Sequence, residues 1–157
     1  MDVCPDYEDL FKIFNAHKIK YLIVGGQAAI YYTEPRYTKD MDVWVIQELN
    51  DPKKILGSLK NFGAPLKGVT IEDFKNKNII IQIGVAPVRI DILLNVEGVS
   101  FSVAWKNRKR AKYGETPINL LNINDLIKSK KHAGRPQDML DLEKLLDVKG
   151  LSKKRKV

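Results

Sequence analysis

The chain has 157 residues, a net charge of +8 and a pI near 9.5, with 44% hydrophobic and 29% charged residues. This composition is typical of a globular protein and excludes an intrinsically disordered chain. No stretch approaches the roughly 18 apolar residues of a membrane-spanning helix, so no membrane partner is expected. The length fits a single domain, which we expect over residues 1–150, followed by a basic tail at residues 151–157.

The first third of the chain predicts helices that alternate with short strands. Apolar residues at helical spacing predict a helix over residues 6–18, and a short apolar run predicts a buried strand over residues 21–24 that ends at a glycine pair. A second helix is expected over residues 27–32 and a second strand over residues 41–46. A third helix begins at Asp51-Pro52, with proline in its first turn, and runs to about residue 61.

The rest of the chain predicts more strands and then two helices. Residues 78–84 and 88–96 indicate two strands joined in a hairpin by residues 85–87. Residues 99–105 favour a further strand, followed by a basic loop over residues 106–112 and an extended stretch near residues 118–121. Helices are expected at residues 123–133 and 136–146, because Gly134 ends the first and Pro136 opens the second. This order indicates an α+β or α/β domain in which helices flank a mixed β-sheet.

The charge and the two ends of the chain bear on partners and location. A basic surface suits phosphate-rich partners such as nucleotides and RNA. Part of the excess lies in residues 152–157, which hold four positive charges; this segment resembles a nuclear-localisation signal by pattern, and a frayed basic tail is the simpler interpretation. The acidic N-terminus lacks a signal-peptide pattern and Cys4 is the only cysteine, which together favour a cytoplasmic protein.

The segment Asp40-Met41-Asp42-Val43 places two carboxylates on one side of a strand. Successive side chains of a strand alternate between its faces, so Met41 and Val43 point into the core while Asp40 and Asp42 point out together. Neighbouring carboxylates repel each other and need compensation, which a divalent metal such as Mg²⁺ supplies. Two solvated aspartates at the start of a strand are the simpler alternative for this segment alone.

A third carboxylate lies on a later strand. Ile90, Ile92 and Leu94 share one face of that strand, and Asp91 lies on the other. A charged residue among strong strand formers is unfavourable unless it is paired or exposed. If this strand lies beside the strand at residues 41–46, Asp91 joins Asp40 and Asp42 in a two-metal site.

Gly25 and Gly26 stand between a predicted strand and a predicted helix. Glycines there allow the backbone to approach a ligand closely, and the N-terminus of the helix offers free N–H groups to a phosphate. A simple turn is the commoner reason for such a pair.

Lys130 shares the apolar face of its predicted helix, whereas Lys128 and Lys131 do not. A lysine that faces inward needs an anionic partner. A triphosphate would serve, and so would Asp138 or Asp141. A lysine that extends its ammonium group to solvent is the alternative.

These segments together resemble the nucleotidyltransferase superfamily, which has the DNA polymerase β-like fold. Its signature is a hydrophobic residue with Gly-Gly, then Asp-hydrophobic-Asp after a gap, then a third carboxylate on a later strand, and here these are Val24-Gly25-Gly26, Asp40-Met41-Asp42 and Asp91. The closer likeness is to AbiEii-toxin-like and related small prokaryotic proteins, and it extends from about residue 21 to residue 146. Its further matches are Arg36, Thr38, Lys130, Ala133-Gly134-Arg135, Asp138 and Asp141.

The resemblance implies that a nucleoside monophosphate passes from an NTP to a hydroxyl acceptor, with release of pyrophosphate. Asp40, Asp42 and Asp91 would hold Mg²⁺ or Mn²⁺, and Asp91 would also help to deprotonate the acceptor hydroxyl. The catalytic residues expected on this basis are Asp40, Asp42, Asp91 and Lys130.

The resemblance also implies a set of nucleotide-binding residues. Gly25, Gly26 and Thr38 would hold the phosphates, and Lys130 would neutralise the triphosphate. Arg36 would either contact phosphate or pair with a carboxylate, and the sequence favours neither.

Three residues near the C-terminus have more modest expected roles. Asp138 and Asp141 would orient Lys130 or cap the last helix, and capping is the simpler interpretation because Asp138 falls in a first turn. Arg135 is expected to be structural.

The acceptor is less specified than the reaction. By resemblance alone, tRNA or a protein is the leading acceptor, with the enzyme acting as the toxin of a toxin–antitoxin pair and an antitoxin as a partner protein. The alternatives are a small-molecule (antibiotic) nucleotidyltransferase and a catalytically silent nucleotide- or RNA-binding module. The presence of all three carboxylates favours catalysis. Few residues follow Asp91, so the acceptor is expected to lie across an open face or on a partner.

Overall fold

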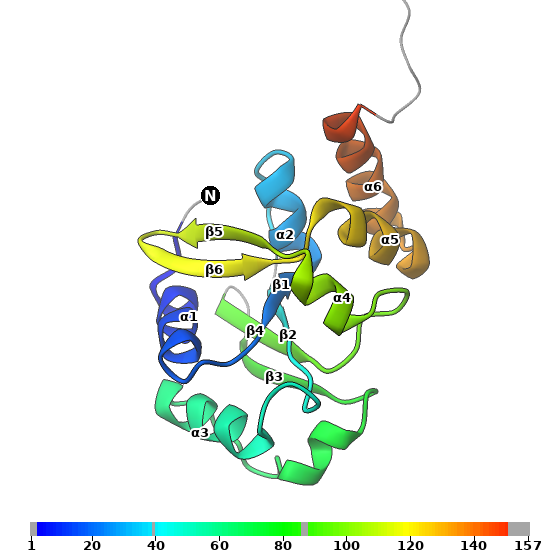
Figure 1. Ribbon diagram of the computed structural model, residues 1–157. Helices are drawn as coiled ribbons and strands as arrows, with labels where there is room; N and C mark the ends of the chain where they lie inside the picture. Colours follow the sequence, from blue (N-terminus) through cyan, green and yellow to red (C-terminus); the bar gives the residue numbers. More distant parts are fainter. Residues whose placement is uncertain (1–2, 39, 86–87, 151–157) are drawn as a thin grey trace, which may run out of the picture.

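The structure is a computed structural model that describes residues 3–38, 40–85 and 88–150 (Figure 1). Within these ranges the helices are α1 (Pro5–Ala16), α2 (Gly25–Tyr32), α3 (Pro52–Phe62), α4 (Phe101–Lys106), α5 (Ile123–Ala133) and α6 (Pro136–Lys149), with a 3-10 helix η1 (Ile71–Lys75). The strands are β1 (Leu22–Val24), β2 (Met41–Trp44), β3 (Ile80–Val85), β4 (Val88–Leu93), β5 (Lys109–Tyr113) and β6 (Thr116–Leu120).

The strands form one mixed sheet in the order β3-β4-β2-β1-β6-β5. β2 is parallel to β4 and β1 is parallel to β6, whereas the other neighbouring strands are antiparallel. Helix α1 packs against α3, β4 and β6, and helices α2, α5 and α6 pack together beside β1 and β2 (Figure 1). The predicted class, a mixed sheet with flanking helices, is therefore confirmed.

The alternation of side chains along β2 and β4 determines which of their residues are buried in the core. Met41, Val43 and Ile92 are fully buried, as is Val45 just beyond β2, and Ile90 is almost fully buried. These residues share one face of β2 and β4 because paired residues of neighbouring strands point the same way. The strand pattern therefore predicts correctly which side chains enter the core.

The prediction of a strand over residues 99–105 is wrong, because residues 101–106 form helix α4. The segment fits both periodicities: Phe101 and Val103 alternate as in a strand, whereas Phe101, Ala104 and Trp105 have helical spacing. The structure buries Phe101 and Ala104 and leaves Val103 54% exposed. Phe101 meets Trp44 edge to face, with ring centroids 4.9 Å apart, so packing on the sheet selects the helix.

The prediction of a basic loop over residues 106–112 is also wrong for its second half. Residues 109–113 form β5, which pairs in antiparallel fashion with β6 through a turn at Gly114. The run of cations favoured a loop in the sequence analysis. However, β5 is an edge strand, and exposed lysine side chains are common on edge strands because they discourage pairing with other chains.

Other boundaries differ by a few residues. Helix α2 begins at Gly25 rather than at residue 27, and α6 extends to Lys149. The register of β3 and β4, with Val85 opposite Val88, confirms the predicted hairpin, although residues 86–87 lie outside the described part of the chain, as does the basic tail at residues 151–157. Across the residues described, no helix has both the length and the apolar character needed to cross a membrane.

Candidate active site

The three aspartates singled out from the sequence converge at one place on the sheet. Asp42 of β2 lies directly opposite Asp91 of β4, and Asp40 precedes Asp42 by two residues. One carboxylate oxygen from each of the three lies within 4.8 Å of the other two. The convergence predicted from the alternation of side chains is therefore confirmed, and it depends on the parallel pairing of β2 with β4.

The three carboxylates repel one another, and Asp42 is affected most. Burial, together with the charges of Asp40 and Asp91, raises the pKa of Asp42 to about 7. Burial and the charge of Asp91 also raise the pKa of Asp40, although Arg89 partly offsets this effect. Among the described residues, no cation lies within salt-bridge distance of Asp42.

Arg89 is a member of the site that the sequence analysis missed. Its Nε and Nη2 atoms donate to the two carboxylate oxygens of Asp91 at 3.0 and 2.9 Å, and Nη2 lies 3.9 Å from Asp40. A usable signal was present, since Arg89 and Asp91 are two residues apart on a strand and so share a face. Each Asp91 oxygen accepts one bond from Arg89 and keeps a further lone pair for another partner.

The start of helix α2 fits closely against Asp42. Gly25 follows β1 directly and has a positive φ of 67°, a conformation that L side chains rarely adopt. A Cβ atom at this position would collide with Oδ2 of Asp42. Glycine therefore allows the free N–H groups at the start of α2 to lie beside the carboxylates, where they also present the positive end of the helix dipole.

We expect Gly25→Ala to damage the site. The new methyl group must displace Asp42, and the left-handed backbone costs about 1–2 kcal/mol of folding stability. Gly57→Ala in α3 is the matched control, because it has open space around its Cβ and should stabilise that helix by about 0.5–1 kcal/mol. Urea denaturation of both variants measures the difference, and equal stability of the two would contradict the close fit at Gly25.

Side chains of the segment before β2 form hydrogen bonds with helices α2 and α6. The Thr38 hydroxyl donates to the Asp40 carbonyl at 3.0 Å and accepts from Gln27 of α2 at 3.1 Å. Arg36 makes a two-bond ion pair with Asp141 of α6, with distances of 3.1 and 2.8 Å. The sequence left open whether Arg36 contacts phosphate or pairs with a carboxylate, and the structure shows that it pairs with the carboxylate of Asp141. A Cβ at Gly26 would lie 2.9 Å from Nη2 of Arg36, so a larger residue there would displace the guanidinium group from this packing.

Lys130 points inward, as its place on the apolar face of α5 predicts. It is 5% exposed, whereas Lys128 and Lys131 are exposed. Its Nζ lies 2.9 Å from Asp141 and 3.3 Å from Asp138. Burial alone would raise the pKa of Asp141, but hydrogen bonds from Arg36 and Lys130 outweigh it and hold that pKa below its usual value.

Asp138 combines the two roles considered for it. It accepts the backbone N–H of Arg135 at 3.2 Å, which caps α6, and it also binds the Lys130 ammonium. The Arg135 side chain returns to Asp138 at 2.7 Å and remains 76% exposed. Its charge lowers the pKa of Asp42, so Arg135 contributes to the site's electrostatics as well as to the helix start.

These groups line one open cavity of about 780 Å³, within the range of ligand sites in proteins. The predicted residues that line it are Gly25, Gly26, Arg36, Thr38, Asp40, Asp42, Asp91 and Lys130. Arg89, Arg135, Gln82 and Gln137 also line the cavity, and the sequence analysis gave none of them a role in binding a ligand. Gln82 lies opposite Asp91 in the sheet, a pairing that the sequence of β3 does not reveal.

The carboxylates suit a divalent cation. They offer hard oxygen ligands from three side chains at short mutual distance, and their mutual repulsion adds to burial in raising the pKa of Asp42. A cation bound by Asp40, Asp42 and Asp91 would remove that repulsion.

No protein-family model matches this chain, and no curated protein matches it significantly. The structure is similar to the crystal structure of the lincosamide antibiotic adenylyltransferase LnuA with lincomycin bound. The TM-score is 0.59 and the sequence identity 14%, and the superposition covers 94% of this chain and 99% of the other. At this identity the likeness concerns the fold, and it shows that the chain has a nucleotidyltransferase-like fold.

Proposed function

We propose that this protein is a metal-dependent nucleotidyltransferase that moves a nucleoside monophosphate from an NTP to a hydroxyl group. The observation that carries the proposal is the convergence of Asp40, Asp42 and Asp91 beside the start of α2, in a cavity edged by cations. The fold of LnuA, an adenylyltransferase, supports it. Metal ligands and phosphate-binding N–H groups side by side are what phosphoryl transfer requires.

Asp40, Asp42 and Asp91 would hold Mg²⁺ or Mn²⁺. When bound, such ions stabilise the charge that develops on the transferred phosphate and on the attacking and leaving oxygens. The Asp42 carboxylate is the central ligand in this proposal, because it lies opposite Asp91 in the sheet and beside the start of α2, and no cation among the described residues is within 4.0 Å of it.

The N–H groups of Gly25 and Gly26 would hold the phosphates of the NTP. Lys130 lies deeper, where Asp138 and Asp141 engage its ammonium group. With Arg36 and Arg135 the network contains three cations and two carboxylates, so it keeps a net positive charge at the edge of the cavity. In this arrangement Lys130 attracts the triphosphate and also fixes α6 against α5.

Asp91 would accept the proton of the acceptor hydroxyl, as the base of the reaction. The two bonds from Arg89 fix the orientation of the Asp91 carboxylate, so the plane of its remaining lone pairs is set before substrate binds. Arg89 is therefore a positioning residue for Asp91.

The acceptor belongs to the finer part of the proposal. RNA or a protein, modified by a toxin that an antitoxin neutralises, remains our first candidate by the sequence resemblance alone, and of these two acceptors the basic charge of the chain favours RNA. A small hydroxylated molecule is the second candidate. It is favoured by the likeness to an antibiotic adenylyltransferase over nearly its full length, and by a hollow of about 210 Å³ that adjoins the cavity and shares Asp42 and Lys130 with it.

We expect an NTP and Mg²⁺ to stabilise the protein together more than either does alone. A ligand at 100 times its dissociation constant stabilises the native state by about 2.7 kcal/mol. A cation held by Asp40, Asp42 and Asp91 would also attract the triphosphate, so each ligand should favour binding of the other. Thermal unfolding with each of the four NTPs, with and without Mg²⁺, measures this effect. Additive shifts, or none, would count against the proposed site.

Transfer itself is tested with each NTP labelled at the α-phosphate. The purified protein is incubated with cellular RNA, with cellular protein and with a panel of hydroxylated small molecules, and the label is followed. Label on one class identifies the acceptor. Cooperative binding of NTP and Mg²⁺ without transfer to any class would indicate the catalytically silent module instead.

A further inference from the structure

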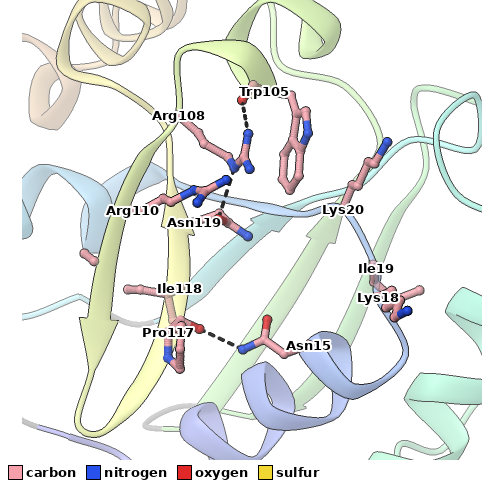
Figure 2. Close-up of a pocket in the computed structure, with 11 residues that line it drawn as sticks. Asn15, Lys18, Ile19, Lys20, Trp105, Arg108, Arg110, Pro117, Ile118 and Asn119 are labelled. Carbon is pink, nitrogen blue, oxygen red and sulfur yellow. Dashed lines mark hydrogen bonds between the residues drawn. The ribbon is translucent and has the colours of Figure 1, made fainter.

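A second hollow, of about 420 Å³, lies at the other end of β1 from the aspartates (Figure 2). Lys20 precedes β1 and lines this hollow, whereas Gly25 follows β1 and lines the first cavity. Among the described residues, none lines both. The hollow is bounded by the end of α1, the segment before β1, the end of α4 and the β5–β6 hairpin.

The wall of this hollow is cationic. Lys18, Lys20, Arg108 and Arg110 line it, and no acidic side chain is among the described residues that do. Within the described part of the chain, none of these four cations has a carboxylate within 4.0 Å. Four cations that share one hollow without anionic partners favour an anionic ligand.

Arg108 is held in place although it lacks a carboxylate partner among the described residues. Its Nη1 donates to the Trp105 carbonyl at 2.8 Å, its Nε donates to Oδ1 of Asn119 at 3.2 Å, and its guanidinium lies 3.9 Å from the centre of the Trp105 ring (Figure 2). Burial, and then the charge of Arg110, lowers the pKa of Arg108. The side chain is therefore ordered in advance for a ligand.

The cations continue along the edge of the sheet. Lys109, Arg110 and Lys112 are exposed on β5, which is the edge strand beside the hollow, and Lys106 is exposed at the end of α4. Edge protection explains single lysines, but it does not explain a hollow that gathers lysine and arginine from two stretches far apart in the chain, residues 18–20 and 108–110. A linear polyanion would contact the hollow and the edge together.

We propose that the hollow at the start of β1 binds the phosphodiester backbone of a single-stranded nucleic acid, which continues along β5. Guanidinium groups match phosphate oxygens in geometry and charge. A single strand can bend to place a phosphate inside the hollow, whereas a duplex, with a persistence length of about 150 base pairs, is too stiff to do so. The proposal does not depend on the proposed nucleotidyl transfer, because this site shares no described lining residue with the first cavity.

The test is fluorescence anisotropy with a labelled oligouridylate and the full chain. EDTA is present and NTP is absent, so the carboxylate site does not contribute. We expect Lys20→Ala/Arg110→Ala to raise the Kd at least tenfold. We also expect it to reduce the slope of log K against log salt by about 1.4, since each lost phosphate contact of a single strand accounts for about 0.7. Both side chains are exposed, so the fold should be unaffected.

The matched control is Lys54→Ala/Lys77→Ala, which removes the same charge from exposed positions in α3 and before β3. It should change the Kd less than twofold. Equal weakening by both double variants would overturn the proposal, because net charge alone would then explain binding. If the alanine pair unfolds, Lys20→Gln/Arg110→Gln takes its place with the same expected result.

Two further probes separate the alternative ligands. A labelled oligoglutamate of equal charge should bind more weakly than the RNA; equal affinity that falls in the same variant would instead indicate an acidic protein partner. Uridine monophosphate at the same total nucleotide concentration should not displace the oligomer. Displacement would show that the hollow binds a free nucleotide and not a strand.

Discussion

Asp42→Asn is expected to abolish Mg²⁺-dependent NTP binding and to reduce transfer by about 100-fold or more, the size of effect seen when one electrostatic stabiliser is removed from a reaction centre. Asp42 lies opposite Asp91 in the sheet and beside the start of α2, so it connects the carboxylate cluster with the proposed phosphate-binding N–H groups. Isothermal titration of a non-hydrolysable NTP in the presence of Mg²⁺ measures the loss. Glu143→Gln, an exposed change on α6 away from the cavity, is the control for loss of one negative charge and should bind normally.

Asp42→Asn should also change how the stability of the metal-free protein depends on pH. The pKa of Asp42 is about 7 in the folded protein against 3.8 for an unperturbed aspartate, so between about pH 4 and pH 7 the folded state holds more protons than the unfolded state. Stability from this group therefore falls as pH rises through that window. The asparagine that replaces Asp42 carries no charge, so the metal-free variant should gain stability relative to the original protein as pH rises from about 5 to about 8. A loss at the upper end of this range would show that the Asp42 carboxylate has a structural role.

The alternation of side chains predicted the aspartate cluster because a strand has only two faces. It could not show that β2 and β4 are neighbours, since their pairing joins segments almost fifty residues apart through contacts that no local pattern records. The sequence analysis gave Arg89 no role, although its position two residues before Asp91 on a strand indicates that the two side chains share a face and can pair.

The errors at residues 99–112 have a common physical cause. Residues 101–105 satisfy helix and strand periodicities together, and the helix is the form that packs Phe101 against Trp44 and buries Ala104. Residues 109–113 have a charged sequence that is unfavourable for a buried strand but acceptable at the edge of a sheet. In both places tertiary packing outweighs local preference, and these same segments supply part of the wall of the hollow that we propose to bind nucleic acid.

Lys130 shows how the structure narrows a set of alternatives. The helical spacing predicted its inward direction but left open whether the partner was a triphosphate, Asp138 or Asp141. Both aspartates bind it, and each is only 2% exposed. Whatever Lys130 contributes to nucleotide binding, it must therefore also hold two buried carboxylates in place.

Lys130→Met is accordingly expected to lower the free energy of unfolding by about 1.5–3 kcal/mol, because Asp138 and Asp141 lose their charge-assisted bonds to the ammonium group while each keeps an arginine partner. Lys131→Met, exposed on the other side of α5, is the control and should change stability by no more than about 0.5 kcal/mol. Urea denaturation measures both.

The structure also predicts a second substitution that should restore part of the stability lost in Lys130→Met. Asp138→Asn added to Lys130→Met removes one of the two buried charges that the ammonium group had helped to neutralise, while asparagine can still accept the N–H of Arg135, and Asp141 keeps its ion pair with Arg36. The double variant should therefore be more stable than Lys130→Met alone. In the original protein the pKa values of Asp138 and Asp141 lie below the usual value, so their stabilising charge is present above about pH 4 and lost as pH falls. The loss of stability caused by Lys130→Met should therefore become smaller as pH falls. If Lys130→Met instead unfolds like the original protein at neutral pH while its affinity for an NTP falls tenfold, then Lys130 acts on the triphosphate and its bonds to the two aspartates contribute little to the fold.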